Sequence, residues 1–352
     1  MRNLVIYFPD IFKPLQFKNE MARIDLPALP ALSRLISHAH RSQFNAPNCI
    51  ETLFKLFAID VPQHQNYPVA ALTYLAEVGD PGDDWCIRID PVHLQIDRDH
   101  LILVDNYMLK IKDKEAYELI ASINHEYQDD AFTIEPGSAG HWFIRTETDP
   151  CVRTHSINDV IGKNIEPYLM SGERRQYWQS IMNEIQMLLH NHKVNEKRTR
   201  EGLLPVNSVW LWGEGRLTDF RNRNDAGLWQ QVYTSNNMCT GLAKITGLPV
   251  HSVPSGFADW IEMNATLGND DEGRTLVMLG DIYACLRYRD FEQWQFLLQE
   301  FEDKWAVPIT HALKRGDLDS LEIYDGNGRC YRVTPALLKR WWRRTHSLAQ
   351  SI

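Results

Sequence analysis

Short apolar runs alternate with amphipathic stretches along most of the chain. The runs at 4–8, 208–212 and 274–279 are almost uninterrupted, which is typical of strands that are covered on both faces. Between such runs, apolar residues recur at helical spacing, for example over 29–42 and 174–192. Because strands that alternate with helices favour parallel pairing, the pattern predicts an α/β fold with three layers: a mostly parallel sheet with helices on both faces.

A cluster of Gly, Pro and Asp residues at 79–84 interrupts this alternation. After this cluster, the pattern predicts strands at 85–89 and 101–105, a helix at 115–127, and strands at 131–135 and 141–145. This order of elements is typical of a compact α+β unit. We therefore predict an inserted α+β subdomain over 83–147, while residues 1–82 and 148–352 form the α/β core domain.

The last part of the chain carries two further signals. Residues 291–316 have a helical pattern that Pro308 interrupts. Two short apolar runs, at 320–324 and 330–334, follow this helix, and the turn residues between them include Gly326 and Gly328. Apolar runs joined by such residues favour a β-hairpin.

Composition and charge narrow the class of protein. The chain has 352 residues, of which 44% are hydrophobic, enough for a large core. Its formal net charge of −9 argues against nonspecific nucleic-acid binding, which depends on many Lys and Arg contacts to phosphate. No apolar stretch reaches the roughly 18 residues of a membrane span, and the start of the chain does not have the pattern of a signal peptide. The six scattered cysteines lack a CxxC pair, as expected of thiols in a reducing cytosol. We expect a cytoplasmic protein without nucleic-acid or membrane partners.

A polar loop precedes the apolar run at 208–212. It contains Asn195, Arg198 and Asn207, and the run itself ends in a Gly-Glu-Gly sequence at 213–215. The guanidinium of Arg198 is a planar fork suited to phosphate or carboxylate, and ligands of open α/β sheets bind at the carboxyl ends of strands. The loop therefore indicates either an anion site or a hydrogen-bonded structural loop.

Two other clusters allow a chemical and a structural interpretation. The stretch from Asp90 to His100 interleaves Asp and His, which suggests metal ligands, although closely spaced Asp residues more often form turns. The stretch from Lys339 to His346 is basic and aromatic, which is compatible with nucleic-acid binding. In view of the acidic net charge, we favour a C-terminal helix that packs its Trp pair on the body of the protein.

Several motifs together resemble known proteins. The segment from His192 to Gly215 resembles the archaeal-type cofactor-independent phosphoglycerate mutases. The matching positions are His192, Asn195, Arg198, Pro205, Asn207, Trp210, Gly213 and Gly215. Residues 148–150 resemble their DTDPH segment, with Cys151 in place of the histidine. The match to the RpfE-type regulatory proteins, a bacterial offshoot of that group, is closer, and its longest motif runs from Trp85 to Leu103.

The resemblance implies an alkaline-phosphatase-like core, in which two metal ions clamp a phosphoryl group that a serine or threonine carries transiently. This sequence departs from that pattern. Asp10 is the one acidic residue near the first expected metal ligand, and Cys49 aligns with the nucleophile. Asp281 is kept without the neighbouring histidine, and the final hairpin has no Asp-His pair. Loss of most ligands leaves little to neutralise a transferring phosphoryl group.

From these departures we expect a phosphoglycerate-mutase-like protein that has lost two-metal phosphoryl transfer. It would act as a regulatory or anionic-metabolite-binding protein, without a cofactor. The expected ligand-binding residues are His192, Asn195, Arg198, Asn207, Gly213 and Gly215. One alternative is an active phosphoglycerate mutase or phosphohydrolase that holds manganese or zinc with Asp10, Asp149 and Asp281. Another is a structural partner protein, binding a second protein or a second copy of itself through its Trp-rich C-terminal face.

Overall fold

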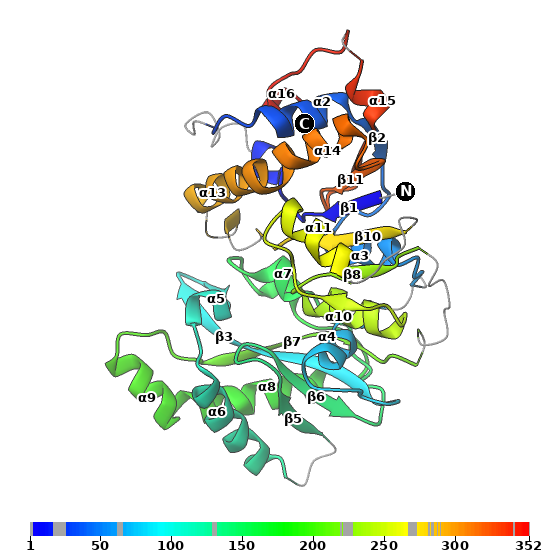
Figure 1. Cartoon of the computed structure of the whole chain (residues 1–352). Helices are drawn as coiled ribbons and strands as arrows, with labels where there is room; N and C mark the ends of the chain where they lie inside the picture. The colour runs from blue at the N-terminus through cyan, green and yellow to red at the C-terminus, as the bar shows by residue number, and fades with distance from the viewer. Residues whose placement is uncertain are drawn as a thin grey trace. The chain divides into compact units, whose positions relative to one another are not determined.

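The chain folds into two compact units (Figure 1). The computed structural model describes residues 3–16, 26–61, 66–128, 132–218, 220, 228–266, 273–280, 282, 285, 286, 288, 290–340 and 342–351. The first unit comprises residues 1–60 and 223–352, and the second comprises residues 61–222. The second unit is therefore much longer than the insertion expected at 83–147, and it begins and ends at different points.

The first unit is built on a seven-stranded sheet. In spatial order its strands are β2 (His40–Gln43), β12 (Arg329–Val333), β11 (Ser320–Tyr324), β1 (Asn3–Tyr7), β10 (Arg274–Met278), β8 (Gln231–Tyr233) and β9 (Val250–His251). All neighbours from β11 to β9 are parallel, whereas β12 and β2 pair antiparallel at one edge. The mostly parallel sheet confirms the expected fold class. Strands β11 and β12 form the expected hairpin. The strand β2 was missed, because its residues continue the helical pattern of 29–42.

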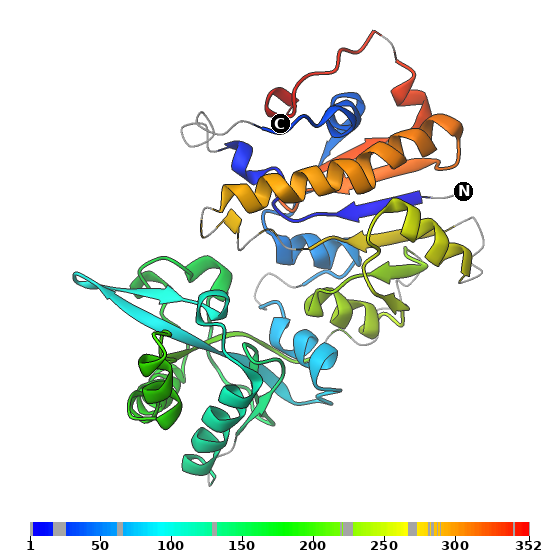
Figure 2. The same ribbon diagram turned by 60° about the vertical axis from the view of Figure 1, so that its left-hand side comes forward.

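Helices cover both faces of this sheet (Figure 2). One layer contains α2 (Pro30–His38), α11 (Phe257–Thr266), α13 (Phe291–Phe301), the π-helical turn η3 (Glu302–Ala306) and α14 (Val307–Arg315). Leu4 and Ile6 of β1 point into the core under this layer. Alternate residues of a strand point to opposite faces, and Tyr7 accordingly donates a hydrogen bond of 3.1 Å to the carbonyl of Cys49. Cys49 opens α3 (Cys49–Leu56), which lies on the other face with α10 (Asn237–Ile245).

Three short helical elements complete the described part of the first unit. They are the 3₁₀ turn η1 (Lys13–Gln16), α15 (Pro335–Leu338) and α16 (Leu348–Ser351). None of the helices in the described ranges is long and apolar enough to cross a membrane.

The second unit contains an antiparallel sheet. Its strands are β4 (His100–Val104), β3 (Trp85–Asp97), β6 (Trp142–Thr146) and β5 (Thr133–Pro136), and β7 (Ser208–Gly215) also pairs with β3. Its helices are α4 (Val69–Glu77), α5 (Asn106–Leu109), α6 (Asp113–Glu126), α7 (Ile157–Val160), the 3₁₀ turn η2 (Glu166–Tyr168), α8 (Arg175–His190) and α9 (Lys193–Arg200). The side chains of α6, α8 and the sheet form one apolar core.

The apolar run that ends at Gly215 is the largest departure from the expected topology. The sequence pattern predicts that this run joins the parallel core sheet, whereas β7 pairs antiparallel with β3, for example Trp210 with Asp90. Because β7 belongs to the second sheet, the helices on either side of the 83–147 segment join that unit as well. An apolar run specifies burial, but it does not specify which strand will be its neighbour.

Candidate functional site

The residues expected to bind an anion are mostly structural, beginning with Arg198. Its side chain on α9 is completely buried. It donates to the Glu115 carboxylate at 2.7 Å and to the carbonyl oxygens of Leu204 at 2.8 Å and Leu109 at 2.5 Å. The guanidinium thus fastens α9 to its neighbours inside the second unit, and the expectation that it faces a ligand is wrong.

The two asparagines have similar internal roles. The amide of Asn195 donates to the carbonyls of Leu189 and Val206 and accepts from the Val206 N–H, all between 2.7 and 2.8 Å. Asn207 exchanges two hydrogen bonds with the backbone of Leu94 on β3. Each amide therefore replaces a missing backbone partner, which is the usual role of a buried polar side chain.

His192 caps the start of α9. Its Nδ1 accepts from the Val194 N–H at 3.2 Å, and its Nε2 lies 2.9 Å from the Ser122 hydroxyl. Burial lowers the pKa of His192, and the nearby Lys193 charge adds to this. A neutral imidazole that is already bonded at both nitrogens attracts an anion weakly, so the structure gives His192 a capping role as well.

The two glycines of β7 bring the end of this strand close to α4. Gly213 has a left-handed backbone with φ of 69°. A Cβ on Gly215 would lie 2.6 Å from the Cβ of Pro68, a distance that real side chains do not reach. Of the six residues expected to bind a ligand, Gly215 is the one that lines the cavity described below.

The Asp- and His-rich stretch is not a metal-binding loop. Its residues from Asp90 to Asp97 belong to β3, and the turn follows at Arg98, which has φ of 55°. Asp90 is buried and bonded to Arg88. His93 contacts the carbonyl of Pro205 through its Nδ1 at 2.9 Å. Since successive residues of a strand point to opposite faces, the stretch does not gather its acids and imidazoles around one point.

In the first unit, the structure brings Asp10 and Cys49 together. Asp10 follows β1, has φ of 59° and is almost fully buried. The Cys49 thiol at the start of α3 lies 3.9 Å from Asp10 Oδ2. The two positions that the resemblance assigns to a metal ligand and to the nucleophile are therefore neighbours.

This pair does not fit a two-metal centre. Asp10 Oδ1 already accepts from the Asn327 amide at 2.9 Å and lies 3.3 Å from the Lys13 ammonium. A divalent cation would have to displace both donors. Within the described ranges, no group of three or more His, Cys, Asp or Glu side chains is placed to hold a metal ion. Asp281 lies outside the described residues, and Asp149 belongs to the second unit.

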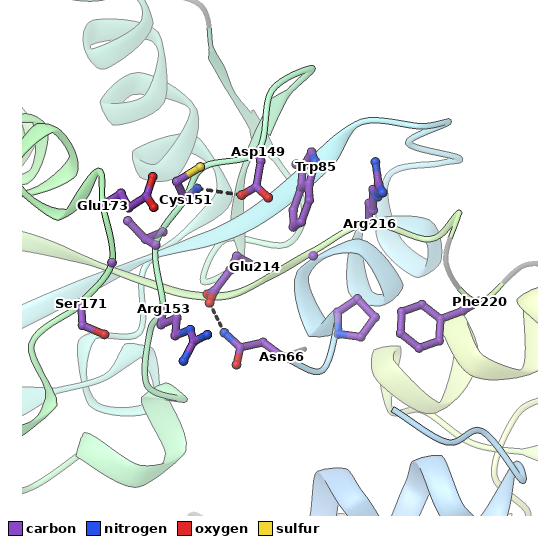
Figure 3. Close-up of a pocket in the computed structure, with 14 residues that line it drawn as sticks. Asn66, Trp85, Asp149, Cys151, Arg153, Ser171, Glu173, Glu214, Arg216 and Phe220 are labelled. Carbon is purple, nitrogen blue, oxygen red and sulfur yellow. Dashed lines mark hydrogen bonds between the residues drawn. The ribbon is translucent and has the colours of Figure 1, made fainter. Parts of the chain in front are cut away.

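The second unit contains an open cavity of about 660 Å³ (Figure 3). Its walls come from the segment before α4, the start of β3, the loop after β6, the turn before α8 and the end of β7. The lining residues are Asn66, Pro68, Trp85, Asp149, Cys151, Val152, Arg153, Ser171, Gly172, Glu173, Glu214, Gly215, Arg216 and Phe220. A cavity of this size with a few convergent polar groups is the usual form of a small-molecule site.

Two arginines line this cavity. The Arg153 side chain is exposed and makes no hydrogen bond or ion pair with another described residue, while its backbone pairs with that of Ser171. Arg216 lies over the ring of Trp85, 5.3 Å from its centre. In the view of Figure 3, Arg153 and Asn66 lie on one side of Glu214, and Asp149 and Cys151 on the other. Arg153 is thus a cation in a cavity wall whose donors no other described residue uses.

Glu214 is the buried acid of the same wall. It accepts from the Asn66 amide and from both the hydroxyl and the N–H of Thr154. Burial raises the pKa of the Glu214 carboxyl, although the hydrogen bonds from Thr154 and Asn66 oppose the shift. The protonated form carries no charge, so the raised pKa acts to weaken the repulsion between this wall and an anion.

Of the lining residues, the sequence predicts only Gly215 as ligand-binding; Asp149 was considered as a metal ligand and Cys151 as a departure from a motif, and neither Arg153 nor Arg216 was predicted. One signal was present: Arg153 follows closely on the Thr148–Pro150 motif, and Arg216 follows directly on the Gly-Glu-Gly sequence. What the sequence does not reveal is which of the many arginines line a cavity, because that depends on segments far along the chain.

Comparison with known proteins supports a relationship to one enzyme class. A family model described as 2,3-bisphosphoglycerate-independent phosphoglycerate mutase matches residues 77–195, which lie inside the second unit. A probable enzyme of this name from Geobacter sulfurreducens is 29% identical over 201 residues, covering 56% of this chain and 49% of the relative. Another from Methanothermobacter thermautotrophicus is 30% identical over 199 residues, covering 54% and 47%. The chain spans about half the length of these relatives.

A solved structure supports the fold. The PH0037 protein from Pyrococcus horikoshii aligns with a TM-score of 0.54 at 14% identity, over 94% of this chain and 87% of that one. The chain is therefore phosphoglycerate-mutase-like in sequence, with an α/β fold that carries an additional antiparallel-sheet unit.

Proposed function

We propose that this phosphoglycerate-mutase-like chain has lost two-metal phosphoryl transfer and binds a small phosphorylated or carboxylated metabolite in the cavity of its second unit. The observation that carries the proposal is Arg153, a cation in the cavity wall whose donors are not engaged by the described residues. Arg216 and the amide of Asn66 line the same space. Guanidinium groups bind phosphate and carboxylate through paired, charge-assisted hydrogen bonds.

Loss of catalysis is supported by the surroundings of Asp10. Its carboxylate is bonded to Asn327 and lies beside Lys13, so the expected metal position is filled by donors of the protein itself. The expected nucleophile position holds Cys49 instead of serine or threonine. Phosphoryl transfer depends on cations that neutralise the transferring group, and a single ammonium is a poor substitute for two metal ions.

The proposal also includes a regulatory role for the protein in the cytosol. It is supported by the resemblance of Trp85 to Leu103 to the RpfE-type regulatory proteins. In the fold this motif builds most of the β3–β4 hairpin, and its first residue, Trp85, lines the cavity beneath Arg216. The wide spacing of the six cysteines, without a CxxC pair, is what leads us to place the protein in a reducing compartment.

The binding proposal is tested by titration calorimetry with 3-phosphoglycerate, 2-phosphoglycerate and glycerol 3-phosphate. We expect Arg153→Ala to weaken binding about tenfold or more, because a hydrogen bond to a charged group contributes roughly 1.5–3 kcal/mol. Arg200→Ala is the matched control, since Arg200 is an exposed arginine outside the cavity. Equal affinity of the wild type and Arg153→Ala, or no binding of any of the three compounds, contradicts the proposal.

The competing function is an active, metal-dependent phosphoglycerate mutase or phosphohydrolase, which the names of the relatives favour. It would use manganese or zinc held by a set that includes Asp10, Asp149 or Asp281. Elemental mass spectrometry after incubation with both metals and desalting separates the two functions. About two equivalents per chain, as a two-metal site requires, together with interconversion of 3- and 2-phosphoglycerate, would establish the enzyme. We expect neither.

A further inference from the structure

The C-terminal part of the first unit has a charge opposite to that of the whole chain. The protein carries a net charge of −9, yet no Asp or Glu occurs from Gly326 onward. Six cations occupy this region: Arg329, Arg332, Lys339, Arg340, Arg343 and Arg344. Four of them flank Trp342, whose side chain is 66% exposed. Trp341 lies outside the described residues. The expected packing of a terminal Trp pair onto the body is therefore wrong for Trp342.

The segment that carries Trp342 is held in place by its backbone and by one arginine. Arg343 Nη1 donates to the carbonyl oxygens of His38 at 3.1 Å and Ala39 at 3.3 Å. The N–H of His346 donates to the Ser37 hydroxyl at 3.0 Å. Buried leucines close both ends, Leu338 before the segment and Leu348 after it. In Figure 2 the red segment between α15 and α16 runs as a loop along the edge of the first unit.

A restrained segment with an exposed indole is costly for the fold. Fixing a backbone segment opposes folding by roughly 1–2 kcal/mol per residue, and an indole that is 66% exposed gains only a minor part of the burial free energy that a core Trp gains. The fold thus restrains a segment that presents its largest apolar side chain, with Lys339, Arg340 and Arg344, to solvent. Large exposed apolar groups with charged neighbours mark interaction sites, and Trp and Arg are the residues that most often dominate binding energy there.

Exposed basic residues also occur on β2, directly after the residues that Arg343 binds. Arg343 binds the carbonyl oxygen of Ala39, and the next two residues in the chain, His40 and Arg41 of β2, are exposed. Arg41 lies over the ring of Tyr331 on β12, 5.9 Å from its centre. We call the set of Arg41, Lys339, Arg340, Trp342 and Arg344 the basic loop surface.

We propose that the basic loop surface docks a short acidic segment of a partner protein, with an apolar or aromatic side chain of that segment packed on Trp342. Charge complementarity favours such a partner over a long polyanion. Screening limits exposed charges to a range of about 8 Å at physiological salt, so a short segment experiences chiefly the local cations. A nucleic acid or an anionic membrane extends beyond them and meets the repulsion of an acidic protein. The proposal specifies what kind of partner protein the chain would bind under the structural-partner alternative. It does not depend on the metabolite cavity.

The test uses fluorescence anisotropy on the full chain with a labelled peptide of about ten residues in which Glu alternates with Tyr. Such a peptide spans at most about 35 Å. We expect the peptide to bind and Trp342→Ala to weaken binding about tenfold or more, as for a hot-spot residue. The double reversal Arg340→Glu with Arg344→Glu is expected to abolish binding. Arg343 is left intact because it holds the segment.

Matched controls come from the same unit. Phe296 on α13 is 57% exposed, and Phe296→Ala removes an exposed aromatic ring elsewhere. Lys314→Glu with Arg315→Glu reverses two exposed cations at the end of α14. Both controls should leave the peptide affinity unchanged, and thermal unfolding verifies that every variant is folded.

The same variants are titrated with oligouridine and with phosphatidylserine-containing vesicles, and are run in the analytical ultracentrifuge. The proposal is overturned by tighter, Trp342-dependent binding of oligouridine or vesicles than of the peptide. A Trp342-dependent dimer overturns it as well, since the surface would then bind a second copy. So does the absence of peptide binding at about millimolar concentration, which corresponds to only about 4 kcal/mol.

Discussion

The guanidinium of Arg88 is bonded to the carboxylate of Asp90, two residues further along β3, by hydrogen bonds of 2.7 and 2.8 Å. Residues two apart on a strand point to the same face, and here both side chains are buried. Arg88 lies between the rings of Phe143 and Trp212, about 5.3 and 5.2 Å from their centres. The Trp212 indole N–H donates to Asp90 at 2.8 Å. Asp90 is therefore the counter-ion of a buried core cation.

Replacement of Asp90 by asparagine should destabilise the second unit strongly. Removal of one partner leaves the Arg88 charge buried without compensation, which lowers the free energy of unfolding by about 3–5 kcal/mol. Urea denaturation followed by circular dichroism measures the change. Asp97→Asn, at the exposed end of the same strand, is the control and should have little effect. A loss below about 1 kcal/mol for Asp90→Asn would show that the pair matters little.

Arg198→Met should be a stability variant and not a binding variant. It removes the bonds to Glu115, Leu109 and Leu204, and it leaves those acceptors without their donor in the interior. We expect a loss of about 3 kcal/mol in the free energy of unfolding. Arg200→Met, on the exposed side of α9, should be nearly neutral. If folded Arg198→Met lost metabolite affinity at full stability, the buried role assigned to Arg198 would be wrong.

Glu302 in the π-helical turn caps a helix that lies about 270 residues earlier in the chain. Its two carboxylate oxygens accept from the N–H groups of Ala31 at 2.7 Å and Leu32 at 2.8 Å, at the start of α2. Glu302→Ala removes both bonds and the favourable charge at a helix N-terminus, so we expect a loss of about 2 kcal/mol. Thermal unfolding measures this loss. Asp303 is the exposed neighbour of Glu302, and Asp303→Ala is the control. An equal loss of stability for Glu302→Ala and Asp303→Ala would refute specific capping.

Glu77 should make the second unit sensitive to acid. Burial opposes its ionisation, but the hydrogen bond and charge of His141, at 2.6 Å, and the Ser138 N–H outweigh burial and lower the pKa of Glu77 from 4.5 to about 2. Because the pKa is lower in the folded than in the unfolded protein, the ionised Glu77 stabilises the fold at pH values above about 4.5. This stabilisation is lost as the pH falls from about 4.5 towards 2.

The variant Glu77→Gln tests this pH dependence. With allowance for solvent screening, we expect it to be about 1 kcal/mol less stable than wild type at pH 6. The two proteins should converge in stability as the pH approaches 2, as followed by urea denaturation at a series of pH values. Glu126→Gln, at the exposed end of α6, should follow the wild-type curve. Parallel curves for Glu77→Gln and wild type would contradict the assigned shift.

Local patterns were sufficient for most elements of the fold. The strand at 3–7, the helix over 113–126 and the hairpin of β11 and β12 all follow from residue periodicity and turn residues, which act over a few positions. The break near Pro308 also appears, although the π-helical turn absorbs it just before the proline. The partner of β7 did not follow, since pairing with β3 is decided by packing between segments about 120 residues apart.

For the candidate site, too, some features follow from the sequence and others only from the tertiary structure. The sequence by itself identified the phosphoglycerate-mutase resemblance, the α/β class and the mismatch at Asp10 and Cys49, because residue identities carry these. Only the tertiary structure decided that Arg198 is buried while Arg153 lines a cavity. A guanidinium has the same donors in either place, and whether they meet a carbonyl or a ligand depends on which distant segments the fold brings beside them.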